Sequence, residues 1–274
     1  MNNKNELDFL LNLLFEVGNS RKEHPEGHVR AKAHYAEAIL IKTFLHISAV
    51  NSMLEKLNVV KANGKRIPFV DHSSIAVMVR AGLESYLTFS HIYSNPDPNI
   101  TDFRYHCWDL QGYIERSKYA SNDGEFQDLI QKENQLRLEK IELLESLDIY
   151  NGLSPSKKNR IKQGKWKLDY TWADLAENSG FDRLFFKANY SYLCEYAHTG
   201  RVSAMQIFGA LKAKKNDVLI NPMILTCLTV LAKLIMEYVL INEPSMETFN
   251  SNPNNIIVCN KWKDFGENLT LDSN

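Results

Sequence analysis

Two charged residues interrupt one of the most apolar segments of the sequence, IAVMVRAGLESYLTF. Arg80 and Glu84 are four residues apart there, so on a helix they share one face. His91 lies seven residues beyond Glu84, on much the same stripe. Charges removed from water need partners, because an unmatched buried ion is strongly destabilising. We therefore expect a buried pair. It is either an ion pair that ties helices together or part of a polar pocket in which Arg80 holds a phosphate or carboxylate.

A second polar cluster follows in NYSYLCEYAHTGR. Tyr192, Glu195 and His198 fall three residues apart on one side of the expected helix, and Arg201 comes next. In di-iron helical proteins a Glu-x-x-His pair holds metal, but that chemistry needs two such pairs and the sequence has one. No metal is therefore expected. His198 is either a structural residue at a helix end or a general acid or base near neutral pH.

These two clusters supply the candidate site. We expect Arg80, Glu84 and His198 to be its catalytic residues. The expected ligand contacts are Arg201, Tyr192 and Glu195. The motifs GxxxxGK[ST], GxGxxG, GxSxG and HExxH do not occur in the sequence. The sequence therefore lacks the motifs that are typical of nucleotide hydrolysis, dinucleotide binding, serine esterases and zincins. No cofactor is expected.

A short basic segment, SPSKKNRIKQGKWKLDY, follows an acidic helical one over 125–147. One interpretation is a phosphate-binding loop in which Lys157, Lys158 and Arg160 contact nucleic acid and Trp166 is a stacking platform. The alternative is a basic loop that folds against the acidic helix, as short charge clusters commonly do.

The elements that must position these residues are helical. Apolar residues three to four apart predict an all-α bundle of about eight helices, one of them elongated and charged. Asp71, Ser73 and Ser74 are candidate N-caps for the third helix, and Thr101 or Asp102 for the fourth. KANGKRIP is a turn, and only IIVC at 256–259 looks strand-like. The expected helices cover 7–17, 28–57, 75–93, 101–119, 125–147, 171–180, 181–197, 202–211 and 221–241.

Composition limits the protein classes. Thirty-two Lys and Arg against 33 Asp and Glu give a formal net charge of -1, so no global field favours nucleic acid or a membrane. The four scattered cysteines indicate reduced thiols, and the first residues are unlike a signal peptide. The one membrane-length stretch, 222–241, carries Lys233 and Glu237 and is expected to be a buried core helix. We expect a cytoplasmic protein with no membrane contact.

The segments RAGLESYL and TWADLAENSGFDRLFFKANYSYLCEYAHTG resemble a bacterial all-helical family of unknown function. In that family an Arg-x-x-x-Glu helix precedes a short Trp-containing helix and a Tyr-x-x-Leu-x-x-x-x-His helix. The resemblance covers about residues 30–240 and implies a helical fold. The matching residues are Arg80, Glu84, Trp172, Tyr190, Leu193 and His198.

A more distant likeness is to the helical ribonuclease modules of toxin and defence systems, in which an Arg and a His at a short spacing act on RNA. This chain departs from that pattern, because Arg201 follows His198 instead of preceding it. Arg80 would have to supply the cation from another helix.

Two hypotheses of function follow. The first is a helical binding or interaction protein with a polar Arg/Glu/His cluster, acting in defence or regulation. The second is a metal-independent ribonuclease with His198 as general base and Arg80 or Arg201 contacting the phosphate. RNA, a protein partner and a second copy of the chain are the candidate partners. We expect one helical domain over 1–242 and a peripheral or partly disordered tail over 243–274.

Overall fold

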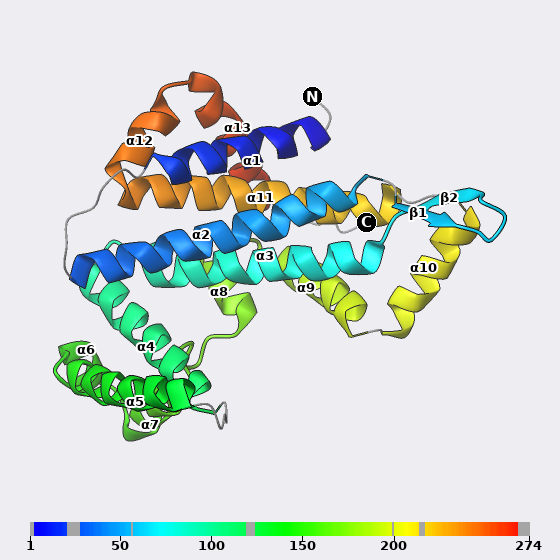
Figure 1. Ribbon diagram of the computed structural model, residues 1–274. Helices are drawn as coiled ribbons and strands as arrows, with labels where there is room; N and C mark the ends of the chain where they lie inside the picture. Colours follow the sequence, from blue (N-terminus) through cyan, green and yellow to red (C-terminus); the bar gives the residue numbers. More distant parts are fainter. Residues whose placement is uncertain are drawn as a thin grey trace. The chain divides into compact units, whose positions relative to one another are not determined.

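The computed structural model describes residues 3–20, 28–55, 57–118, 124–198, 200–213 and 217–267 (Figure 1). The chain is all-α, with thirteen helices and one two-stranded sheet in those residues. Its residues cluster in two compact units, 1–89 with 172–274 and 90–171. The single domain expected over 1–242 stays a prediction, since compactness does not show whether the units unfold together.

The first unit holds most of the helices. α3 begins in it and ends in the second unit, to which α4 to α7 belong. The elements of the first unit are α1 (Asn3–Asn19), α2 (His28–Met53), β1 (Leu57–Val60), β2 (Arg66–Phe69), α3 (His72–Tyr93), α8 (Trp172–Asn178), α9 (Arg183–Ala197), α10 (Arg201–Ala213), α11 (Asp217–Ile241), α12 (Glu243–Asn250) and α13 (Pro253–Glu267).

α11 is the core helix of this unit. It packs against α1, α12 and α13, and its residues from Cys227 to Ile235 are buried without a break (Figure 1). Among the described residues, Val218–Ile241 is long and apolar enough to cross a membrane, a test that the buried core helix of a soluble protein also passes. Lys233 is 3% exposed and donates to Glu267 Oε1 at 2.7 Å, so its charge is partnered inside the fold.

α3 is the helix that positions Arg80. Asp71 caps it by accepting from the backbone N–H of Ser74 at 3.0 Å. Gly82 lets α2 approach, because a Cβ at this position would lie 3.2 Å from Ile47 Cγ1. α3 is thus held closely against α2, with Arg80 and Glu84 on a less buried side of the helix.

The chain between α2 and α3 is a β-hairpin. β1 pairs with β2 antiparallel, with Leu57 opposite Phe69. The predicted turn is present between the strands, where Gly64 has φ of +77° and its N–H donates to Lys61 O at 2.8 Å. The flanking strands were not expected, because four residues carry too little alternation to be recognised.

The expected irregular tail is wrong as far as Glu267, because α12 and α13 cover it. Residues 268–274 lie outside the described part of the chain. IIVC is helical rather than a strand, since Pro253 favours a helix start and Asn252 accepts from the N–H of Asn254 at 3.0 Å. Val258, Cys259 and Trp262 are buried, so this segment belongs to the core and is not peripheral.

α13 is locked to α1 by a buried carboxylate. Glu6 is 4% exposed and accepts from Trp262 Nε1 at 2.5 Å and from Lys261 Nζ at 2.7 Å.

Glu6→Gln should lower the free energy of unfolding by about 1–3 kcal/mol. The neutral amide cannot form the charge-assisted hydrogen bonds, and its NH2 group would face an N–H donor of Trp262 or Lys261. Chemical denaturation measures this. Glu16→Gln, on the exposed face of α1, is the control, and equal stability of both variants would contradict the prediction.

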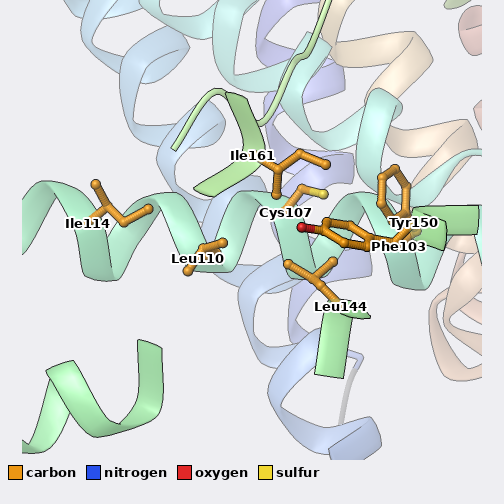
Figure 2. Close-up of a cluster of buried hydrophobic side chains, with 7 residues drawn as sticks. All are labelled: Phe103, Cys107, Leu110, Ile114, Leu144, Tyr150 and Ile161. Atoms are coloured by element: carbon orange, nitrogen blue, oxygen red, sulfur yellow. The ribbon is translucent and has the colours of Figure 1, made fainter. Parts of the chain in front are cut away.

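The second unit has its own small core. Phe103, Cys107 and Leu110 of α4 pack with the residues of three later helices that Figure 2 labels. Asp97 caps α4 by accepting from the N–H of Asn99 at 2.9 Å, so the expected caps at Thr101 and Asp102 are wrong. The elements are α4 (Pro98–Arg116), α5 (Gly124–Glu145), α6 (Asp148–Asn151) and α7 (Pro155–Lys162).

The helix count of about eight is too low. Each expected helix has a counterpart, and the structure adds α6, α7, α12 and α13. These added helices span four to fifteen residues, and α7, α12 and α13 have a Pro in their first two residues, which looks like a loop residue in the sequence.

Candidate functional site

Arg80 on α3 is the centre of a polar cluster in the first unit. Its three nitrogens each face a different partner: Nε donates to Glu84 Oε1 at 2.9 Å, Nη2 donates to the Tyr190 hydroxyl at 3.2 Å, and Nη1 lies 3.2 Å from His198 Nε2. The side chains of Arg80 and Glu84 are 24% and 28% exposed. The pair is therefore half-buried and reachable from solvent, not sealed in the core as expected.

Tyr190 on α9 joins the two ends of this network. Its hydroxyl donates to Glu84 Oε1 at 2.5 Å, and its ring stacks on Phe186 with centroids 5.3 Å apart. Burial, followed by the hydrogen bond to Glu84, raises the pKa of Tyr190, so the phenol stays protonated and keeps donating. Tyr190 thereby fixes the Arg80–Glu84 pair in one geometry.

The contact between Arg80 and His198 places one ring nitrogen of the imidazole against the guanidinium. A guanidinium can only donate hydrogen bonds, so in this contact His198 Nε2 accepts from Arg80 Nη1. His198 is exposed at the end of α9. The site thus presents an imidazole lone pair next to a fixed positive charge.

Arg80 stays positively charged in this cluster. Burial acts to lower the pKa of Arg80, but the hydrogen bonds to Glu84 and Tyr190 outweigh it and raise the value overall. The nearby Cys194 has its pKa raised, chiefly by burial, so it is a neutral thiol and not a nucleophile. The cluster therefore contains one fixed cation, one carboxylate, a phenol and an imidazole.

The expected ligand contacts Tyr192, Glu195 and Arg201 are not among the three hydrogen-bond partners of Arg80 described above. The Tyr192 hydroxyl donates to the Leu219 carbonyl at 3.1 Å, which ties α9 to α11. Glu195 lies over the backbone of Gly200, where an added Cβ would be 1.7 Å from its Oε2. Arg201 is exposed at the first residue of α10. Within the described residues, no group of three or more metal-ligating side chains is suited to a metal ion.

His91 does not join the cluster. It belongs to the second unit and is 7% exposed, with the rings of Trp166 and Tyr170 at 5.6 and 5.4 Å. Burial, with smaller contributions from the charges of Arg104 and Lys167, lowers the pKa of His91 to about 3. This histidine is neutral and structural at physiological pH.

The basic segment is not a loop, because its first half forms α7. Lys157 contacts Asp169 at 2.9 Å and Arg160 pairs with the same carboxylate, while Lys158 donates to the Asn151 carbonyl at 3.0 Å. Lys162 Nζ donates to Glu145 Oε1 on α5 at 2.6 Å. These pairings favour the interpretation in which the segment folds against nearby acids and the acidic helix.

Tyr190 is the residue that site prediction from the sequence missed. It lies in the resemblance motif, but no spacing rule marked it as a partner of Arg80. One signal was available in the sequence. Tyr190, Cys194 and His198 are spaced four residues apart, and residues at this spacing lie on the same face of a helix. Its role as a partner of Arg80 and Glu84 depends on the packing of α9 against α3, which local spacing does not show.

Comparison with known proteins identifies the family. Searches of curated proteins and of solved structures gave no significant match. A family model, described as a family of unknown function (DUF5677), matches residues 63–215, which is more than half of the chain and includes all four residues of the cluster. The expected resemblance to a family of unknown function is confirmed. The chain belongs to this family of unknown function, DUF5677.

Proposed function

We propose that the protein binds a phosphate-bearing ligand, an RNA strand, at Arg80 and His198. The observation that carries this proposal is the set of partners around the guanidinium: one carboxylate, one phenol hydroxyl and one imidazole nitrogen, within reach of solvent. Hydrogen bonds from a guanidinium to an anionic oxygen are stronger than those to a neutral hydroxyl or imidazole. A phosphate oxygen can therefore replace His198 or Tyr190 as a partner while Glu84 continues to hold Arg80.

A second candidate function uses the same groups for metal-independent cleavage of RNA. The observation that favours it is the position of His198 Nε2, which lies 3.2 Å from Arg80 Nη1. When a phosphate takes over the Arg80 Nη1–H, Nε2 becomes free to accept the proton of a ribose 2′-hydroxyl. The 2′-oxygen then attacks the adjacent phosphorus, Arg80 stabilises the charge on the phosphorane, and the 5′-oxygen leaves with a proton from water. The products are a 2′,3′-cyclic phosphate and a 5′-hydroxyl end.

Two oligonucleotides of one sequence separate these functions. A 2′-O-methyl strand has the phosphates but lacks the attacking hydroxyl, so its fluorescence anisotropy reports binding alone. The matching RNA strand, incubated with EDTA, reports cleavage. A protein that binds both strands and leaves the RNA intact is a binding protein, whereas one that cuts only the RNA is the ribonuclease. Absence of saturable binding to the 2′-O-methyl strand would contradict the first proposal.

His198→Gln is the variant that tests the imidazole. Glutamine keeps an oxygen that can accept from Arg80, but it cannot take a proton. If the wild type cuts RNA, the variant should cut it about 100–10,000 times more slowly at unchanged thermal stability. His34→Gln, an exposed histidine on α2, is the matched control. Equal cleavage rates in His198→Gln and the wild type would remove His198 as the base.

The cellular setting belongs to the same proposal. The likeness to toxin and defence modules supports a role in bacterial defence or regulation. The four cysteines are all free thiols, which supports a cytoplasmic location. Lys157, Lys158 and Arg160, which belong to the second unit, remain proposed as a separate RNA contact, although each is engaged locally. Unaltered RNA affinity after their joint replacement by Gln would remove them from the interface.

A further inference from the structure

A hollow of about 290 Å³ lies within the first unit, and none of its lining residues belongs to the Arg80 cluster. It is bounded by α11, α12 and α13, which contact one another, and by the end of α8. Most of its wall is apolar. The apolar side chains are Met236, Val239, Leu240, Met246 and Phe249. Its volume is at the lower limit for pockets that bind small organic molecules, so only a compact ligand fits.

The charges at one end of the hollow come from α11 and α13. Lys233 is buried, donates to Glu267 Oε1 at 2.7 Å and to the Ser179 carbonyl at 3.0 Å, and faces the Phe181 ring. Its hydrogen-bonding capacity is largely used by the protein. Lys263 differs, because its Nζ is 3.7 Å from Glu267 Oε2, beyond hydrogen-bond distance. Lys263 therefore offers an ammonium with donors to spare at the edge of an apolar hollow.

The neighbouring carboxylates restrict the charge of a ligand. Glu267 is shared between Lys233 and Lys263, and Glu237 accepts from the Tyr86 hydroxyl at 2.6 Å. The two lysines and two glutamates that line the hollow balance in charge, so a phosphate dianion gains no net attraction there and the head group that fits is a small one in direct contact with Lys263. An uncharged apolar molecule would leave the Lys263 donors unused.

We propose that this hollow binds a small amphipathic carboxylate, with the carboxylate on Lys263 and an unbranched alkyl chain of medium length against α11 and α12. The apolar wall then supplies affinity by covering the chain, and Lys263 sets the orientation. For a ligand of about ten non-hydrogen atoms, the dissociation constant is on the order of 1 mM.

Octanoate is the probe for this proposal, with the protein labelled at its methionine methyl groups for NMR. Saturable shifts of the Met236 and Met246 methyls are expected with octanoate. Acetate has the same head without the chain, and octanol has the chain without the charge, so both should bind at least about fivefold more weakly. Lys263→Gln should weaken octanoate by about fivefold, while Lys187→Gln, an exposed lysine on α9, leaves it unchanged.

Each of three outcomes would overturn the proposal. The first is the absence of saturable shifts at Met236 and Met246. The second is octanol binding as tightly as octanoate, which would make the hollow an apolar crevice without a carboxylate site. The third is an equal effect of Lys263→Gln and Lys187→Gln, which would mean that the net charge of the protein and not Lys263 governs affinity. None of these outcomes depends on the RNA-binding proposal.

Discussion

Replacing Arg80 with lysine should weaken binding of the 2′-O-methyl RNA strand by about 10- to 100-fold, although the charge is kept. The guanidinium directs three nitrogens at three separate partners, on two helices. An ammonium is a compact point charge and cannot meet Glu84, Tyr190 and His198 together. The loss corresponds to one hydrogen bond to a charged group, which contributes about 1.5–3 kcal/mol. Fluorescence anisotropy titration measures the change.

Two companion variants show whether the loss is local. Arg66→Lys on the exposed strand β2 has the same chemistry away from the site and should bind RNA as the wild type does. Tyr190→Phe keeps the stacking on Phe186 but removes the hydroxyl that joins Arg80 to Glu84. It should weaken RNA binding less than Arg80→Lys does, because it loosens the guanidinium without replacing it. Wild-type affinity in Arg80→Lys would show that the cluster only ties α3 to α9.

Arg80 and Glu84 could be nominated from the sequence because a charge in an apolar helix is conspicuous. Their i, i+4 spacing placed them on one face, where the structure joins them by a hydrogen bond. The link to α9 could not be read in the same way. A tyrosine such as Tyr190 occurs in cores and at surfaces alike, and only the packing of α9 against α3 gives its hydroxyl a carboxylate partner.

The long helices could also be predicted, because eleven or more residues repeat the 3.6 period often enough to be recognised. The four residues of β1 and of β2, and the Pro- and Asn-rich starts of α12 and α13, carry no such repeat. In α13, Ile256, Ile257 and Val258 favour a strand locally, but burial of one helical face against α11 and α1 decides the outcome. Contacts between segments distant in sequence override local preference there.

The last turn of α13 approaches α11 closely at Gly266. A Cβ at this position would lie 2.4 Å from Thr229 Cγ2 on α11. Thr229 is 1% exposed and β-branched, and its hydroxyl donates to the Leu225 carbonyl at 3.0 Å, so its methyl has little freedom to move. Gly266→Ala should therefore lower the free energy of unfolding by about 1–3 kcal/mol, as overpacking of a core does. Chemical denaturation checks this value.

Gly209→Ala is the matched control, because it is also a helical glycine but a Cβ there would meet nothing within 4 Å. That substitution should stabilise the protein by about 0.5–1 kcal/mol through the helix preference of alanine. A Gly266→Ala protein that is as stable as the wild type or more stable, as is expected of Gly209→Ala, would contradict the close approach of α13 to α11.

Thr229→Ser identifies the clash itself. It removes Cγ2 and keeps the hydroxyl that bonds to Leu225. Alone, the change should cost about 1 kcal/mol, because it leaves a methyl-sized gap in a buried position. Combined with Gly266→Ala, the new methyl group enters that gap, so the double variant should be more stable than the sum of the two single effects. Strict additivity would place the cost of Gly266→Ala in the backbone of α13 and not in its contact with α11.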